Sequence, residues 1–228
     1  IAVLSLIDDL FNVHQLIRIL IHFLSSYLLI YELSLHELPV FVLVVLFILI
    51  IGWFNAFNFM DGINGMMTMY SISIFLTFYI LNVNIQFVDS KFIEIVLFAL
   101  IIFGFFNIRK NALMFSGDVG SISLSYIITF IFIAFTLKNF NINYILFFSI
   151  YGIDTVWTII DRLRNKQNIF KPHRTHLYQY LVNEIGMNHL FISFVYSATQ
   201  FLINIIVIFI LVPNVKNDIL STTIILIS

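Results

Sequence analysis

The chain has 228 residues, of which 61% are apolar and 10% are charged, and its mean hydropathy is +1.04. Roughly a quarter of the residues in soluble domains are charged, so this composition excludes an ordinary soluble protein and places the chain in a lipid bilayer. The absence of cysteine excludes disulfides and thiolate metal sites, and the formal net charge of -1 gives no indication of nucleic-acid binding.

Long apolar segments follow one another along the chain. Each is about 17 to 25 residues long, the length of a helix that crosses a hydrocarbon core, and none shows the period-2 alternation of a barrel strand. The sequence therefore predicts an all-α, polytopic integral membrane protein with about seven or eight membrane helices. The expected spans are 15–33, 38–55, 66–83, 92–107, 121–138, 141–160 and 188–212, with the start of another at 219.

The segment from Ile1 to Ile7 resembles the tail of a preceding helix, because no initiator Met, basic first segment or signal-peptide pattern accompanies it. We expect a single transmembrane domain over residues 1–228 that lacks its first few helices. The expected cytoplasmic loops cover about 8–14, 56–65, 108–120 and 161–187.

Basic residues separate the loops into two sets. If the helices alternate in direction, eight of the 11 Lys and Arg residues fall on one side of the membrane and three on the other. The positive-inside rule assigns the first side to the cytoplasm. The eight are Arg18, Arg109, Lys110, Arg162, Arg164, Lys166, Lys171 and Arg174, and the three are Lys91, Lys138 and Lys216.

Four polar clusters lie on the predicted cytoplasmic side. Taken singly, each is explained by helix caps or by snorkelling anchors at the membrane interface. Four clusters on one face instead favour a reaction site at the membrane surface. They are Asp8 and Asp9 with Asn12, the segment 55–64, the segment 107–121 and the segment 154–180.

Carboxylates and carboxamides dominate these clusters. Asp8, Asp9, Asp61 and Asp118 are hard oxygen donors, and with Asn58 they suit Mg²⁺, which takes carboxylates and substrate phosphate oxygens and keeps some waters. A cation would also explain how several acids share a small region. Zinc is disfavoured, because cysteine is absent and carboxylates outnumber imidazoles. The alternative for Asp61 and Asp118 is that they cap separate helix starts.

Two glycine pairs, Gly62 with Gly65 and Gly117 with Gly120, immediately precede predicted helices. Free backbone amides at a helix N-terminus bind phosphate, and glycine lets a ligand approach them closely. Small residues near helix ends also serve helix packing in membranes. Together with the adjacent acids, the glycines indicate a site for metal-bound diphosphate.

A basic loop near the C-terminus contains His173, Arg174 and His176. Arg binds phosphate oxygens in a bidentate way and His donates or exchanges a proton, so these residues are candidate phosphate clamps. The alternative is a positive-inside loop that only touches anionic lipid headgroups.

The order of the motifs resembles that of a known family. It runs IDDLFN, NAFNFMDGING, FN followed by MFSGDVGS, D-x(6)-D-R-L-R-N-K and HRTHLYQYL. This order is similar to that of the polyprenyl-phosphate N-acetylhexosamine-1-phosphate transferases, glycosyltransferase family 4, over nearly the whole chain. Many relatives carry adjacent histidines in the last loop. The stretch His176, Leu177, Tyr178, Gln179 instead resembles the O-antigen and capsule branch rather than the related peptidoglycan phospho-MurNAc-pentapeptide translocase.

The resemblance implies a role for each acid. Asp118 would bind the metal, and Asn58 would lie beside it. Asp8, Asp9 and Asp61 would be catalytic, one of the pair Asp8 and Asp9 handling the lipid phosphate or its proton.

The resemblance also implies a substrate-binding set. Phe115, three positions before the aspartate of the GD motif, would stack on uracil, and Asn64 would lie near the same base. The other predicted substrate-binding residues are the candidate phosphate clamps of the basic loop, His173, Arg174 and His176.

The implied reaction transfers an N-acetylated sugar 1-phosphate from a UDP-sugar to undecaprenyl (polyprenyl) phosphate and releases UMP. Such an enzyme initiates a lipid-linked glycan such as O-antigen or capsule, in lipopolysaccharide or cell wall biogenesis. The expected cofactor is Mg²⁺, with Mn²⁺ as the alternative. The expected partners are the UDP-sugar, undecaprenyl phosphate and the bilayer, with a homodimer left open and no nucleic acid. The expected location is the bacterial inner membrane, with the active site facing the cytoplasm.

Two other functions remain as alternatives, a multi-pass transporter and an inactive truncated scaffold protein. Transporters usually place ionisable groups near the bilayer midplane, facing an aqueous path. Mid-span positions here are expected to be Leu, Ile, Phe and Val, with acids at the ends, which favours surface chemistry. The scaffold is favoured only by the missing start of the chain.

Overall fold

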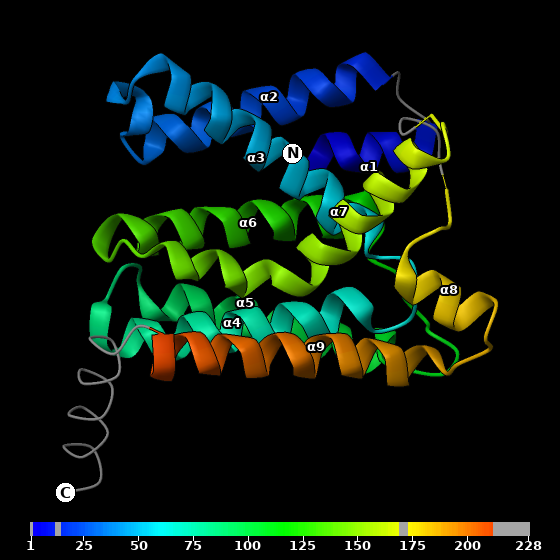
Figure 1. Cartoon of the computed structure of the whole chain (residues 1–228). Coiled ribbons are helices and arrows are strands. Elements are labelled where there is room, and N and C mark those ends of the chain that lie inside the picture. The colour runs from blue at the N-terminus through cyan, green and yellow to red at the C-terminus, as the bar shows by residue number, and fades with distance from the viewer. Residues whose placement is uncertain (1, 12–14, 169–172, 212–228) are drawn as a thin grey trace, which may run out of the picture. The chain divides into compact units, whose positions relative to one another are not determined.

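The computed structural model describes residues 2–11, 15–168 and 173–211, with the side chains in these ranges except those of residues 4, 8–11, 15 and 16 (Figure 1). Every regular element of the described chain is a helix. The elements are α1 (Ala2–Phe11), α2 (Gln15–Glu32), η1 (Leu35–Glu37), α3 (Val40–Phe59), α4 (Met66–Ile85), α5 (Ser90–Asn107), α6 (Gly117–Lys138), η2 (Ile142–Phe148), α7 (Ser149–Arg164), α8 (Leu177–Asn183), α9 (His189–Ile206) and the π-helical turn η3 (Val207–Leu211).

Six helical segments in the described ranges are long and apolar enough to cross a membrane, which confirms the predicted all-α, multi-pass membrane protein. The predicted spans 66–83 and 92–107 agree closely with α4 and α5. The segment α2 is helical as predicted but is not among the six, because Arg18, His22 and Glu32 lower its hydropathy. The six are Val40–Phe59, Met66–Ile85, Ser90–Asn107, Gly117–Lys138, Ile142–Arg164 and His189–Leu211.

The first of two packing units contains residues 1–61 and 116–134. In it α2 and α3 lie side by side, connected through η1 and through Ser34, whose φ is 55°. Leu29 and Phe54 are fully buried between the two helices. Tyr126 of α6 packs on this core, with its ring centroid 6.1 Å from that of Phe54. Apolar burial therefore holds α2, α3 and α6 together.

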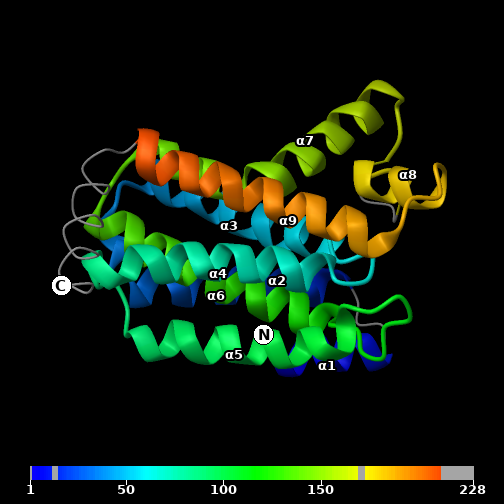
Figure 2. The same ribbon diagram turned by 90° about the horizontal axis from the view of Figure 1, so that it is seen from below.

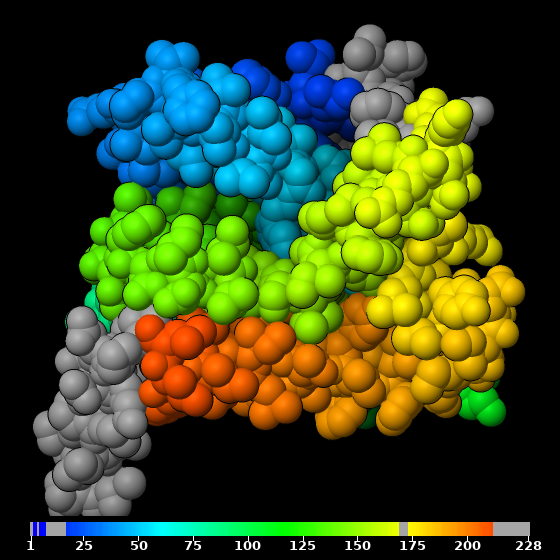
Figure 3. Space-filling model, in the orientation of Figure 1, coloured from blue at the N-terminus to red at the C-terminus, as the bar shows by residue number. Residues whose placement is uncertain are grey.

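The second packing unit contains residues 62–115 and 135–228, and α4 lies at its centre. Within this unit α4 packs between α5 and α9 (Figure 2), and 67% of its span is buried. Thr68, Ser71 and Thr77 are among its buried side chains, and small side chains of this kind let membrane helices approach closely. The outer surface of α9 is uncovered in the view of Figure 3, as expected for a helix that faces lipid.

The predicted helix 141–160 is broken, because η2 winds as a 3₁₀-helix before α7 begins. Gln200, a fully buried residue of α9, bridges the break. Its Nε2 donates to the carbonyl of Leu146 (2.9 Å), and its Oε1 accepts from the amide of Ile150 (2.9 Å). Irregular backbone in a membrane is stable only where such partners satisfy its polar groups.

The predicted loop bounds were wrong where helices extend beyond the apolar segments. Hydropathy marks the part of a helix that lies in hydrocarbon, whereas backbone hydrogen bonds continue the helix past it. The predicted loop 161–187 also contains α8, in which Tyr178 and Val182 are buried. The helix predicted to start at 219 lies outside the described residues. Helical residues in the four predicted loops are 8–11, 56–59, 117–120, 161–164 and 177–183.

Candidate functional site

The ends of two helices of the first unit meet at Asn58 and Asp118. Asn58 lies in the last turn of α3 and Asp118 in the first turn of α6. Asn58 Nδ2 donates to Asp118 Oδ1 at 2.8 Å, and Arg18 Nη1 lies 3.9 Å from Asp118 Oδ2. The structure thus brings together the two predicted metal-site residues and one predicted cytoplasmic arginine.

Asp61 belongs to the same cluster. Its Oδ2 accepts a hydrogen bond from the hydroxyl of Ser116, just before α6. Burial raises the pKa of Asp61 to about 7, the hydrogen bond from Ser116 opposes the rise, and the negative charge of Asp118 adds to it. The alternative interpretation was that Asp61 caps a helix start. Asp61 does not cap α4, because the N-cap of that helix is Gly65.

The chemistry of this cluster fits a Mg²⁺ ion. Asp61 and Asp118 offer carboxylate oxygens and Asn58 a carboxamide oxygen, and Mg²⁺ usually binds through one or two carboxylates together with substrate phosphate and water. The pKa of Asp61 is raised in part by Asp118, a repulsion that a cation would relieve. No group of three His, Asp or Glu side chains suited to a metal occurs among the described residues. Metal binding by this cluster remains a prediction.

Asp8 and Asp9, the predicted catalytic pair, lie in the last part of α1. Their side chains are outside the described residues, so their predicted role is untested.

Hydrogen bonds within the second unit hold the segment that follows Asp61. Gly65, at the left-handed φ of 78°, starts α4, and its amide donates to Asn107 Oδ1 (3.0 Å). The hydroxyl of Thr68 donates to the same oxygen (2.9 Å), while Asn107 Nδ2 donates to the carbonyl of Met114 (2.9 Å). The buried carboxamide of Asn107 therefore joins the start of α4 to the loop before α6, a role that its position at a helix end did not reveal.

Asn64 supports the same loop. Its Nδ2 donates to the carbonyls of Arg109 and Lys110, both at 3.0 Å. That loop ends at Phe115, whose side chain is 71% exposed and therefore accessible to a ligand. The predicted contacts of Asn64 and Phe115 with a nucleotide base remain untested.

Tyr178 of α8 packs directly on Gly62. A Cβ added at Gly62 would overlap the Tyr178 hydroxyl, so only glycine allows this approach. The C-terminal loop and the glycine-containing segment, 116 residues apart in the sequence, therefore meet in the second unit.

The three candidate phosphate clamps differ in exposure. Arg174 is exposed, His173 is half-buried, and His176 is 2% exposed. The rings of His173 and His176 stack with centroids 5.0 Å apart. Burial lowers the pKa of His173 to about 4, with further lowering by the charges of Arg162 and His176. His173 is therefore a neutral imidazole at pH 7.

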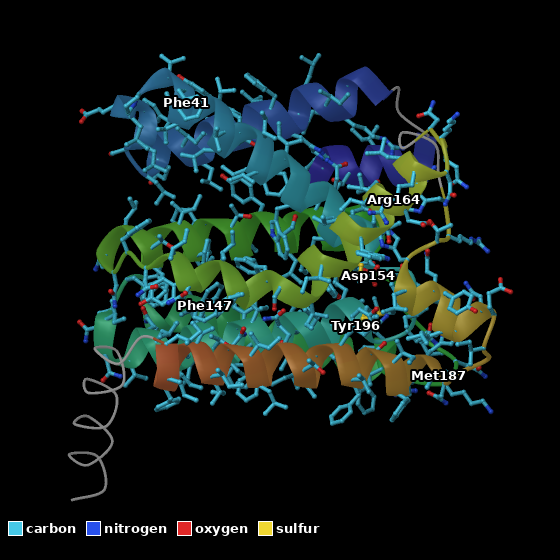
Figure 4. The ribbon with its side chains drawn as sticks, in the orientation of Figure 1. Phe41, Phe147, Asp154, Arg164, Met187 and Tyr196 are labelled. Carbon is cyan, nitrogen blue, oxygen red and sulfur yellow. The ribbon has the colours of Figure 1, made fainter. Side chains whose placement is uncertain are left out.

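Asp154 entered the sequence interpretation only as the first residue of the segment 154–180 and of the D-x(6)-D-R-L-R-N-K motif, without a role of its own, and Tyr196 did not enter it. Asp154 of α7 and Tyr196 of α9 lie next to each other (Figure 4), and the Tyr196 hydroxyl donates to Asp154 Oδ2 at 2.7 Å. Asp154 also binds His176 Nδ1 (3.1 Å). An acid within an apolar segment was the available signal for Asp154. Tyr196 gave no such signal, because tyrosine is common in membrane helices.

Comparison with known proteins identifies the family. Residues 1–136 match the family described as glycosyl transferase family 4. The chain is 29% identical over 145 residues to the probable undecaprenyl-phosphate N-acetylglucosaminyl 1-phosphate transferase of Bacillus subtilis (strain 168), an alignment that covers 61% of this chain and 40% of the relative. The matched region includes the helix ends that carry Asn58 and Asp118. The predicted family resemblance is thus confirmed, and the chain belongs to glycosyl transferase family 4.

Proposed function

We propose that this protein transfers an N-acetylated sugar 1-phosphate from a UDP-sugar to undecaprenyl phosphate. The observation that carries the proposal is the cluster of Asn58, Asp61 and Asp118 at the ends of two membrane helices of a family 4 chain. The name of the Bacillus subtilis relative supports the same lipid acceptor and a sugar 1-phosphate.

In this reaction an oxygen of the lipid phosphate attacks the β-phosphorus of the UDP-sugar. The new oxygen–phosphorus bond forms while the bond from the β-phosphorus to the bridging oxygen breaks, and UMP leaves with that electron pair. The two reactants are anions, so the site must hold them together against their repulsion. Asp61, Asp118 and Asn58 would hold Mg²⁺, which when bound neutralises negative charge on the diphosphate.

In the second unit, taken by itself, the predicted donor-binding residues have side chains suited to that role. Phe115 offers an exposed ring for stacking on uracil, and Arg174 offers a guanidinium that binds phosphate in a bidentate way. Asn64 contributes by holding the loop that ends at Phe115. The site would lie at the cytoplasmic face of a bacterial inner membrane, because nucleotide sugars are made in the cytoplasm. The product would initiate a glycan such as O-antigen or capsule.

Acids were expected only at the ends of the spans, but one acid, Asp154, lies near the middle of a span. Its contacts are less consistent with a transporter than with a packed interior. Asp154, in the segment Ile142–Arg164, is 6% exposed, and both of its oxygens accept hydrogen bonds from protein groups. Such an acid belongs to the packed interior, whereas a transporter needs one that faces an aqueous path.

The proposal is tested with membranes that contain the protein, radiolabelled UDP-N-acetylglucosamine and undecaprenyl phosphate. We expect Mg²⁺-dependent release of UMP that falls at least about a hundredfold in Asp118→Asn, the usual scale for loss of an electrostatic group at a reaction centre. Asp89→Asn is the matched control, because Asp89 caps α5 through a bond that asparagine also makes. Equal UMP release in Asp118→Asn and Asp89→Asn would refute the site, and a panel of UDP-sugars would identify the donor.

A further inference from the structure

A buried carboxylate in α7 organises the loop that carries the candidate phosphate clamps. Asp154 Oδ1 lies 3.1 Å from His176 Nδ1 and accepts from the amide of Leu177 at 3.1 Å, and Oδ2 accepts from the Tyr196 hydroxyl at 2.7 Å. Asp154, His176 and Tyr196 are each less than 10% exposed. A buried carboxylate with this many donors is held in one orientation.

Two contacts compete for His176 Nδ1. The Asp154 carboxylate favours a proton on this nitrogen, whereas the Gln179 backbone amide, from which the His176 side chain accepts in the capping box, favours a lone pair. The bond to the carboxylate is charge-assisted and therefore the stronger of the two. A carboxylate only accepts hydrogen bonds, so Nδ1 must be the protonated nitrogen for the contact with Asp154 to be a hydrogen bond. In a neutral imidazole Nε2 then carries the lone pair. The hydrogen bond also fixes the orientation of the ring, since a rotated ring would lose it.

The orientation of His176 also constrains the neighbouring residues of the loop. His176 is the N-cap of α8, where its backbone amide donates to Gln179 Oε1. His173 stacks on the His176 ring, and Arg174 lies between the two histidines in the sequence. At the other side of the loop, Arg162 of α7 donates to the carbonyl of Asn168 (2.6 Å). Helix α7 therefore holds this loop at two points.

We propose that Asp154 is a positioning residue, which with Tyr196 fixes His176 as the Nδ1-protonated tautomer and so holds His173 and Arg174 where they bind a substrate phosphate. This inference rests on the proposed function for the identity of the substrate. The phosphate belongs to the diphosphate of the UDP-sugar or to the lipid phosphate, and the two sources are distinguished below.

The tautomer is tested by ¹⁵N NMR of the full chain, labelled at histidine and reconstituted in nanodiscs, with the His176 signals assigned by His176→Gln. We expect protonated Nδ1 in the wild type. Asp154→Asn should keep this tautomer. The side-chain carbonyl oxygen of the asparagine can still accept from His176 Nδ1 and from the Leu177 amide, while its side-chain nitrogen donates to the Tyr196 oxygen. Asp154→Ala should lose it. A wild-type His176 protonated at Nε2 instead, or an unchanged tautomer in Asp154→Ala, would overturn the proposal, and the wild-type result decides alone if Asp154→Ala fails to insert.

Kinetics test the consequence for the substrate. Asp154→Ala should raise one KM about tenfold with a smaller change in kcat, the scale of a lost hydrogen bond to a charged group, and Asp154→Asn should recover most of the loss. A raised KM for the UDP-sugar assigns the clamp to the donor diphosphate, and a raised KM for undecaprenyl phosphate assigns it to the lipid. If neither KM changes, the positioning role is excluded.

A matched pair of tyrosine variants separates positioning from general stability. Tyr196→Phe and Tyr70→Phe each remove one buried hydroxyl, from Asp154 in the first case and from Gln200 in the second. Only Tyr196→Phe should raise the same KM, by about threefold for one hydrogen bond. Equal KM changes in both variants would overturn the proposal. If the wild type releases no UMP, the proposed function fails, while the tautomer measurement still tests Asp154.

Discussion

Asn58 and Asp118 are 60 positions apart in the sequence and are joined by a hydrogen bond of 2.8 Å from the carboxamide nitrogen to the carboxylate. The bond connects the end of α3 to the start of α6. It places a carboxamide beside the carboxylate that we propose as a metal ligand, at the boundary between an apolar span and the polar segment that follows it.

The bond should contribute measurably to stability. In Asn58→Ala we expect a loss of about 1.5–3 kcal/mol, the range for a hydrogen bond to a charged group. Thermal unfolding in detergent measures it. Asn55→Ala, one turn earlier in α3, is the control, because Asn55 only bonds the carbonyl of Ile51 in its own helix. A smaller loss in Asn58→Ala than in Asn55→Ala would contradict the assigned bond.

His173 should make the protein less stable in mild acid. Its pKa is about 4 in the folded protein and 6.5 in the unfolded chain, so the unfolded chain binds the proton first as the pH falls. The stability due to the neutral ring is therefore complete above about pH 6.5 and is lost as the pH falls toward 4. Unfolding temperatures at pH 7.5 and pH 5 should differ less in His173→Gln than in the wild type. The same difference in both proteins would rule out this contribution.

Gly62 should not tolerate a side chain. In Gly62→Ala the new methyl group overlaps the Tyr178 hydroxyl, and we expect a destabilisation of about 1–3 kcal/mol from overpacking. Tyr178→Phe in the same chain should recover part of the loss by removing the hydroxyl oxygen. Gly152→Ala is the control, since no atom lies within 4 Å of its added Cβ. Additive effects of the Gly62 and Tyr178 substitutions, measured by thermal unfolding, would exclude the contact.

Phe115 should affect donor binding alone. Phe115→Leu removes an exposed ring, so stability should be unchanged while the KM for the UDP-sugar rises about threefold to tenfold through lost stacking. The Mg²⁺ dependence should stay as in the wild type. Met114→Leu, a substitution of the exposed neighbour, is the control for loop packing. An unchanged KM in Phe115→Leu would argue against a role in base binding.

Much of the fold could be predicted from the sequence, because a helix in lipid requires about 20 consecutive apolar residues and that requirement is local. The predicted span 66–83 and the helix α4 begin at the same residue. The break before α7 could not be predicted, since it depends on Gln200, about 50 positions away in α9. The helix α8 was missed because seven residues are too short for a periodic signal.

The candidate site was likewise predictable from the sequence in part, and the rest depended on the tertiary structure. The amino-acid sequence by itself determined the family, the membrane spans and the polar segments at their ends, because motif order and hydropathy are properties of consecutive residues. Only the tertiary structure decided that Asn58 bonds Asp118, that Asn64 and Asn107 hold a loop, and that Asp154 and Tyr196 fix His176. Those pairings depend on how helices pack, and packing brings together side chains that the sequence separates by tens of residues.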